Sequence, residues 1–185
     1  MNQETLHRFI VLAKKKLKGD WVLLGGTLLY FFNHDYRTTT DIDFVPLGRG
    51  KSNQDLLQTF EIATELGLPV ETINSAALYF LEKIPNYQDE LLVIHKWKSG
   101  RIYRPNLYLF FVLKVARLSE SDYLDCLEFL KIELEEKTPQ FLMRVTDFLK
   151  KALKDSDRKD HERRENIKKL IERVVLLTKA PKVRS

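Results

Sequence analysis

Two aspartates spaced two residues apart are the strongest candidates for chemistry in this chain. Asp41 and Asp43 flank Ile42 in a segment, 41–45, that begins with polar and apolar residues alternating, as in a strand with one exposed face. Because residues i and i+2 of a strand point to the same face, the two carboxylates should project together, with Ile42 directed to the core. Adjacent carboxylates repel each other unless a cation lies between them. Mg²⁺ suits oxygen ligands that it shares with nucleotide phosphates, so the pair predicts a magnesium site.

A pair of glycines precedes these acids at a position suited to phosphate binding. Gly25 and Gly26 follow the apolar run 21–24, which we expect to be a buried strand, and precede 27–32, which we expect to be a short helix. Glycines let the backbone approach a phosphate, and the start of a helix presents free N–H groups to it. An Asp-x-Asp pair alone is weak evidence, but here a metal site and a phosphate site meet, as phosphoryl or nucleotidyl transfer requires.

The rest of the chain predicts the elements that position these residues. Helices are expected at 3–18 and 53–66, and short strands at 69–73, 91–94 and 102–109. Pro105 makes the last of these an edge strand or separates it from a helix that begins near Leu107. Three further helices are expected at 121–135, 138–153 and 157–178. The pattern is that of a sheet domain with helices, 1–106, followed by a helical bundle, 107–185, in an α+β protein.

Two stretches resemble a known family. Gly25-Gly26-Thr27 followed by Asp41-Ile42-Asp43 is similar to the first motif of the AbiEii/AbiGii-type nucleotidyltransferases, which belong to the DNA polymerase β superfamily. Arg37 and Thr39 stand four and two residues before the first aspartate, as is typical of that family. The apolar segment 109–116 carries Lys114 and is followed by Asp122 and Asp125, which resembles the family's second motif. The fold that this implies is a small mixed β-sheet flanked by helices, followed by a C-terminal helical bundle.

The resemblance implies an enzyme that transfers a nucleoside monophosphate from a nucleoside triphosphate with the help of two Mg²⁺ ions. The acceptor would be an RNA, for example tRNA, or a protein. Several relatives are toxins, so an antitoxin protein is an expected partner. The implied catalytic residues are Asp41, Asp43, Lys114 and Asp122, of which Asp41 and Asp43 hold metal. The implied nucleotide-binding residues are Gly25, Gly26, Thr27, Arg37, Thr39 and Arg117.

The chain departs from the family pattern in two places. Ser121 stands where the family commonly has an arginine before the Asp-x-x-Asp pair, and Arg117 lies near enough to substitute in part. The third carboxylate of the superfamily has two candidates, Glu71 and Asp122. Asp122 also follows Ser119 at capping spacing, and an alternative role for it is to begin a helix. If no third carboxylate serves, the chain would be an inactive binding module for nucleotides or nucleic acid.

Composition and charge distribution indicate the protein's cellular location and its binding partners. Residues 150–185 hold 13 Lys and Arg against 6 Asp and Glu, whereas residues 1–149 hold 18 against 20. A basic final helix, with Arg163, Arg164, Lys168 and Lys169 off its apolar stripe, suits contact with RNA, and a solvated helix face is the alternative. No apolar run is long enough for a membrane span, no signal peptide is recognisable, and there is a single cysteine, Cys126. We therefore expect a cytoplasmic protein with Cys126 in packing or on the surface. The aromatic residues Trp97 and Tyr103 beside a turn suggest a surface for a base or packing at a sheet edge.

Overall fold

The computed structural model describes residues 2–36, 39–48, 53–133 and 138–179, and these form two compact units that divide after Asn106. The first unit contains, in chain order, α1 (Gln3–Lys16), β1 (Gly19–Leu23), α2 (Gly25–Phe32), β2 (Ile42–Pro46), α3 (Asn53–Glu65), η1 (Val70–Thr72), β3 (Ile73–Asn74), α4 (Ala77–Leu81), η2 (Tyr87–Glu90), β4 (Leu91–Trp97) and β5 (Gly100–Pro105). The second contains α5 (Leu107–Val115), α6 (Glu120–Ile132), α7 (Pro139–Asp155) and α8 (His161–Lys179).

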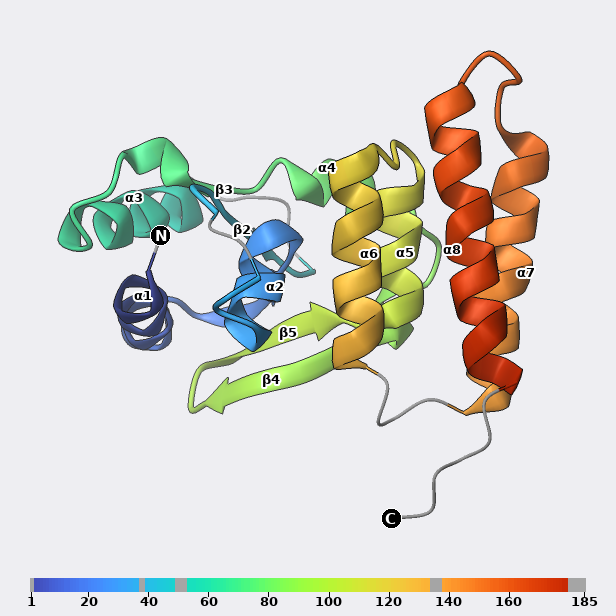
Figure 1. The fold of residues 1–185 in the computed structure, drawn as a ribbon. Helices are drawn as coiled ribbons and strands as arrows, with labels where there is room; N and C mark the ends of the chain where they lie inside the picture. The colour runs from blue at the N-terminus through green and yellow to red at the C-terminus, as the bar shows by residue number, and fades with distance from the viewer. Residues whose placement is uncertain (1, 37–38, 49–52, 134–137, 180–185) are drawn as a thin grey trace. The chain divides into compact units, whose positions relative to one another are not determined.

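The first unit is built on a five-stranded mixed sheet in the order β3-β2-β1-β5-β4 (Figure 1). β1 runs antiparallel to β2 and parallel to β5, while β3 is parallel to β2 and β4 is antiparallel to β5. In this register Leu23 lies opposite Phe44, so the end of β1 meets the beginning of β2. The glycines that follow β1 and the aspartates at the start of β2 are therefore brought to the same end of the two strands.

Aromatic packing joins helix α1 to this part of the sheet. Trp21 stacks on Phe44 with ring centroids 4.9 Å apart, and Phe9 meets Phe44 edge-on at 5.1 Å. All three side chains are almost completely buried. The alternation of side chains along β2 places Ile42, which is fully buried, on the same face as Phe44, and Asp43 on the other. Packing of Phe44 thus determines which way Asp43 points.

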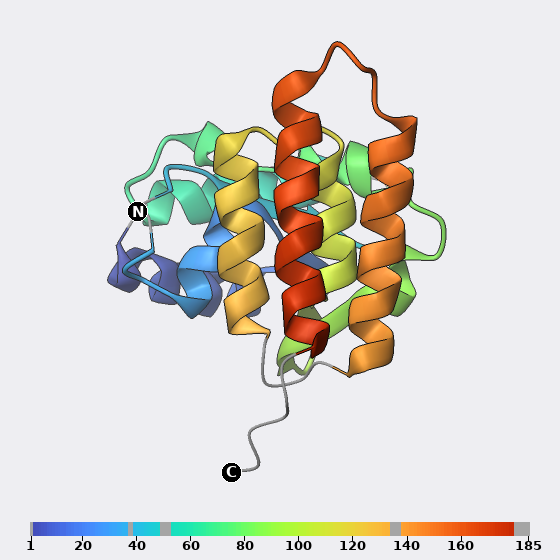
Figure 2. The ribbon, with the colours of Figure 1, turned by 45° about the vertical axis from the view of Figure 1, so that its right-hand side comes forward.

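The second unit consists of four helices that pack on one another (Figure 2). Helix α8 packs against α7 and α6, and α5 packs against α6 and α7. Phe110 of α5 and Phe129 of α6 form a buried ring contact at 4.3 Å. Helix α7 begins at Thr138, whose hydroxyl accepts the Phe141 N–H, with Pro139 in the first turn.

Most of the expected elements are present, with two corrections. The segment 69–73 is not one strand: the 3₁₀ helix η1 occupies Val70–Thr72, and only Ile73 and Asn74 pair with β2. Pro105 does not mark an edge strand, because β5 lies between β1 and β4; it ends β5 just before helix α5. The helix after β1 starts at Gly25, two residues earlier than expected. Within the described residues no helix combines the length and apolar character needed to cross a membrane.

Phe44→Ala is expected to lower the free energy of unfolding by about 3–5 kcal/mol, since it removes a fully buried ring that contacts Trp21 and Phe9. Phe80→Ala is the matched control, because Phe80 is 57% exposed. That substitution should change stability by less than about 1 kcal/mol. Chemical denaturation followed by circular dichroism measures both. Equal losses in the two variants would contradict this account of the core.

Candidate active site

The centre of the candidate site is the close approach of Asp43 to Gly25. Gly25 has φ +62°, a left-handed conformation that favours glycine, at the start of α2. A Cβ atom placed on Gly25 would overlap Oδ2 of Asp43 and lie 2.8 Å from its Cγ. The carboxylate therefore occupies the space that any side chain at position 25 would need. The carboxylate that the resemblance predicts to bind metal and the N-terminus of α2 are thus in direct contact.

The backbone that leads into β2 is held by two threonine hydroxyls. Oγ1 of Thr27 and Oγ1 of Thr39 donate to the carbonyl oxygen of Asp41, at 2.6 and 3.1 Å. Thr27 is fully buried, so in this structure its hydroxyl has a structural role, and its expected contact with a triphosphate stays a prediction. Asp41 itself is exposed and lies just before the strand, while Asp43 is half-buried within it. The Leu24 N–H donates to the Asp43 carbonyl at 2.9 Å and completes the attachment of the glycine turn to β2.

A residue that sequence reasoning missed, Asn74, stands beside Asp43. The register of β3 and β2 pairs Asn74 with Asp43, and paired residues of adjacent strands share a face of the sheet. Its amide oxygen accepts the Ala76 N–H at 3.3 Å. Glu71, a candidate for the third carboxylate, lies in η1 and is exposed rather than in a strand beside the other acids. The short strand expected at 69–73 was the sequence signal that could have pointed to Asn74.

The donor set of this end of the sheet fits magnesium that is shared with a nucleotide. Asp41, Asp43 and Asn74 all carry side-chain oxygen atoms, the ligand type that Mg²⁺ prefers over nitrogen or sulfur. Among the described residues, no group of three or more His, Cys, Asp or Glu side chains could hold a metal by itself. Mg²⁺ in nucleotide enzymes is commonly bound by one or two carboxylates with phosphate oxygens completing the shell. The residues present therefore suit an ion that arrives with its nucleotide.

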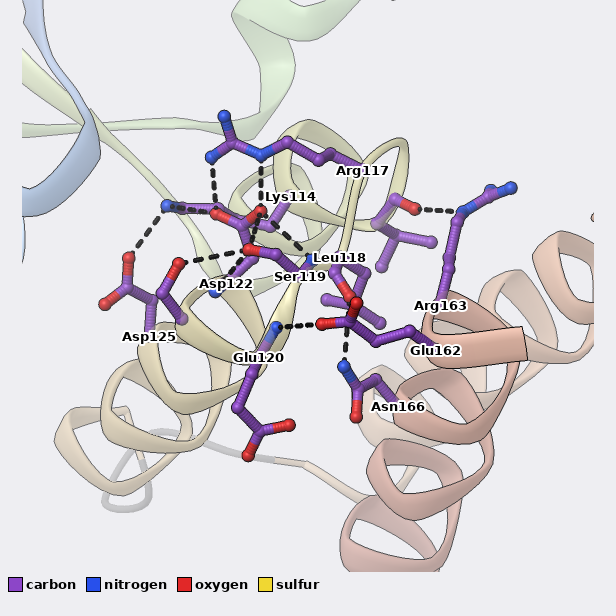
Figure 3. A network of polar contacts seen from close by, with 12 residues as sticks. Lys114, Arg117, Leu118, Ser119, Glu120, Asp122, Asp125, Glu162, Arg163 and Asn166 are labelled. Atoms are coloured by element: carbon purple, nitrogen blue, oxygen red, sulfur yellow. Dashed lines mark hydrogen bonds and ion pairs between the residues drawn. The ribbon is translucent and has the colours of Figure 1, made fainter. Parts of the chain in front are cut away.

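The second unit holds a separate cluster of charges around Asp122 (Figure 3). Lys114 Nζ donates to Asp122 at 2.9 Å and to Asp125 at 2.8 Å. The Arg117 guanidinium makes a two-pronged contact with Asp122 at 2.6 and 2.8 Å. Both aspartates are almost completely buried. Arg117, expected to substitute in part for an arginine missing at Ser121, reaches Asp122 directly, and its expected role with the nucleotide stays a prediction.

Asp122 also stabilises the N-terminus of helix α6. It forms a capping box with Ser119, whose N–H and hydroxyl both donate to Oδ2 of Asp122. Both carboxylate oxygens therefore accept hydrogen bonds from Lys114, Arg117 or Ser119. Although burial alone would raise it, these donors hold the pKa of Asp122 well below its usual range. Such a saturated carboxylate favours the capping role of Asp122 over that of a third metal ligand.

Helix α8 supports the turn that carries this cluster (Figure 3). Arg163 Nε donates to the Val115 carbonyl at 2.9 Å, and the buried Asn166 amide donates to the Leu118 carbonyl at 3.1 Å. Leu118 has φ +38°, a conformation rare for a branched side chain. The Glu162 carboxylate accepts the Glu120 N–H at the start of α6.

The basic residues of α8 are largely occupied within the second unit. Arg164 donates to the backbone carbonyls of Leu153 and Ser156 at the end of α7. Lys168 forms an ion pair with Glu165, and Lys169 lies 5.6 Å from the centre of the Tyr123 ring. RNA binding by this helix stays a prediction, and several of the residues proposed for it have structural partners.

Two further expectations concern single residues. Arg37 lies outside the described residues. Cys126 is fully buried, and burial raises the pKa of its thiol well above the ordinary value, so the thiolate needed for nucleophilic chemistry is disfavoured. Cys126 is a packing residue of α6.

The mixed sheet, the glycine turn and the aspartates at the start of β2 are consistent with a nucleotidyltransferase-like fold. Comparison with known families finds a similarity over part of the chain: the model described as the nucleotidyl transferase AbiEii toxin of type IV toxin–antitoxin systems matches residues 9–82, less than half of the chain. The resemblance predicted from the sequence is confirmed over this segment, which contains Gly25, Asp41, Asp43 and Asn74. The match ends before Lys114 and Asp122. Neither the curated proteins nor the solved structures contain a match to the chain.

Gly25→Ala should destabilise the first unit more than Gly67→Ala. Both glycines have positive φ, but a Cβ at Gly67 would meet nothing within 4 Å. Gly67→Ala is expected to cost about 1–2 kcal/mol for the backbone conformation alone. Gly25→Ala adds the overlap with Asp43, and combining it with Asp43→Ala should recover part of that excess. Denaturation of Gly25→Ala, Asp43→Ala and the double variant gives the coupling free energy between the two positions, with Gly67→Ala as the control. Additive losses of stability would mean that the contact between Asp43 and Gly25 does not constrain the site.

Asp122→Asn should lower the unfolding free energy at neutral pH by about 2–4 kcal/mol, because it leaves Lys114 and Arg117 short of a buried partner. The pKa of Asp122 is depressed in the folded state, so its contribution is fully present above the unfolded pKa near 4 and declines as pH falls below it. The difference between wild type and variant should therefore shrink below about pH 4. Asp147→Asn, at an exposed position of α7, is the control. If the difference in unfolding free energy between wild type and Asp122→Asn grows toward acid pH, the stabilising role given to the Asp122 carboxylate is contradicted.

Proposed function

We propose that this protein is a Mg²⁺-dependent nucleotidyltransferase that transfers a nucleoside monophosphate from a nucleoside triphosphate to an RNA, for example tRNA, or to a protein. The observation that carries the proposal is the contact between Asp43 and Gly25, which joins a metal ligand to a phosphate-binding turn. The family match over 9–82 supports it, because that segment contains the whole of this turn and strand.

In the proposed reaction each group near the turn has a defined task. The first N–H groups of α2 bind the triphosphate, and the absence of a side chain at Gly26 lets it approach, while the space beside Gly25 holds the Asp43 carboxylate. Asp41 and Asp43 would hold Mg²⁺, which supplies charge neutralisation on the phosphates and orients them. The acceptor hydroxyl oxygen bonds to the α-phosphorus as the bond to the leaving pyrophosphate breaks. Asn74 contributes an oxygen ligand but takes up no proton, so the hydroxyl proton passes to an aspartate or to water.

Other residues keep the roles predicted for them by the resemblance. Arg37 and Thr39 are proposed to position the nucleotide from the segment before β2. Lys114 has used two of its three N–H donors, and the Arg117 side chain is 76% exposed, so both retain donors for phosphate. The biological role that we propose is that of a toxin, with an antitoxin protein as the partner that restrains it.

Incubation of the full chain with radiolabelled nucleoside triphosphates, Mg²⁺ and total RNA, or total protein, tests the proposal. An acceptor should become labelled, and chelation of the metal should stop the labelling. Asp43→Asn should reduce it by more than about 100-fold, since it removes a charged metal ligand. Asp89→Asn, an exposed acid far along the chain in η2, is the matched control and should leave labelling unchanged.

Two results would overturn the proposal. One is labelling that is the same in Asp43→Asn and in wild type. The other is calorimetry that detects no Mg²⁺-dependent nucleotide binding, which would instead favour a binding module with the same fold.

A further inference from the structure

A pocket lies at the opposite end of β1 from the candidate active site. It is open to solvent and has a volume of about 660 Å³. Residues at the beginnings of β1 and β5, after β2, and around the turn between β4 and β5 line it. The register pairs Gly19 with Gly100 and Asp20 with Arg101 at this end. Because Gly25 follows the other end of β1, the length of that strand, roughly 13 Å, separates the two sites. The volume is within the range of pockets that hold small molecules.

The walls of this pocket combine aromatic rings with positive charge. Its side chains include Trp97 and Tyr103 together with Lys96, Lys98 and Arg101, against a single acid, Asp20. Arg101 is already bound to Asp20 through two hydrogen bonds of 2.7 and 3.1 Å, and it lies 5.3 Å from the centre of the Tyr103 ring. Lys96 and Lys98 are exposed and have no acidic partner in the described part of the chain. The two lysines therefore give the pocket a net positive charge that no acid among its described lining residues neutralises.

Trp97 differs from the other tryptophan because part of its ring is exposed. Trp21 is 2% exposed, stacks on Phe44 and donates its Nε1–H to the Lys18 carbonyl at 3.1 Å. Trp97 is half-buried, and its Nε1 is the buried side-chain donor that finds no acceptor among the described residues. Because this Nε1 is buried, what Trp97 offers to a ligand is the exposed part of its ring, which lines the pocket.

The backbone beneath Trp97 is shaped to let the ring lie across the sheet. A Cβ on Gly100 would overlap the Gly19 carbonyl and lie 2.7 Å from Cζ2 of Trp97. The turn between β4 and β5 therefore places the ring directly over glycine. The ring has a defined position in the pocket wall.

We propose that this pocket binds a nucleotide unit, either a free mononucleotide or one residue of a single-stranded RNA, with the base against Trp97 and the phosphate near Lys96 and Lys98. Bases present a flat π-face and acceptor atoms, while phosphates present the negative charge that the lysines attract. The site is distinct from the Asp43–Gly25 site and does not depend on that site being catalytic.

The test measures binding by the full chain at low salt, without Mg²⁺ or nucleoside triphosphate. Adenosine monophosphate and a short fluorescein-labelled oligoadenylate are titrated separately, with tryptophan emission followed for the first and anisotropy for the second. Saturable quenching by the monophosphate, or binding of the oligonucleotide, supports the proposal and identifies which source the pocket accepts. In Trp97→Leu only the buried Trp21 emits, so the quenching should disappear, and affinity should fall by roughly 5- to 150-fold.

Matched variants separate a binding role from a structural one. Lys96→Ala/Lys98→Ala should weaken binding and flatten its salt dependence, whereas Lys14→Ala/Lys15→Ala, two exposed lysines of α1, should not. Trp97→Phe keeps a ring for stacking and should bind within severalfold of wild type, even if Trp97→Leu folds poorly. Asp43→Asn should bind normally, which distinguishes this site from the proposed active site. Unchanged affinity in Trp97→Leu and in the double lysine variant, or equal competition by polyglutamate, would overturn the proposal.

Discussion

The candidate site depends on one steric constraint, the absence of a side chain at Gly25 where the Asp43 carboxylate lies. That contact requires a positive φ at Gly25, a β2 strand aligned so that Asp43 faces the turn, and a β1 strand that ends at Leu23. The buried stack of Phe9, Trp21 and Phe44 fixes the alignment, because it decides which face of β2 is turned to the core. Core packing and site geometry are thus parts of one arrangement.

Acidic residues have opposite environments in the two units. Asp122 and Asp125 are buried beside the side chains of Lys114 and Arg117. Both carboxylate oxygens of Asp122 already accept hydrogen bonds, so they are poorly placed to bind a metal ion as well. Asp41 is exposed, with its backbone rather than its side chain held by Thr27 and Thr39. A carboxylate that stabilises a helix start and one that is proposed to receive a cation can therefore both belong to a pair of nearby aspartates in the sequence. Their neighbours in space distinguish them.

The local features of the site could be predicted from the sequence because each depends on residues close together in the chain. The apolar run before Gly25, the helix after it and the alternation around Ile42 are short-range patterns, and the family match over 9–82 agrees with them. The capping role of Asp122 can also be predicted from the sequence, because Asp122 follows Ser119 at the spacing of a capping box. Asn74 could not be found in this way. Its place beside Asp43 comes from the pairing of a two-residue strand with a strand about thirty residues earlier, and so short a strand has no periodicity of its own.

By itself, the sequence determined the order of the longer helices and strands, the glycine turn and the two aspartates, because propensity, side-chain alternation and the special conformations of glycine act over a few residues. Only the tertiary structure decided that Asp43 covers Gly25, that Glu71 stands in a 3₁₀ helix, that Arg117 pairs with Asp122 and that Arg163 and Arg164 hold backbone carbonyls. It also gathered Trp97, Lys96 and Lys98 with the start of β1 into one pocket. These outcomes follow from strand register and helix packing, which bring together residues far apart in the chain.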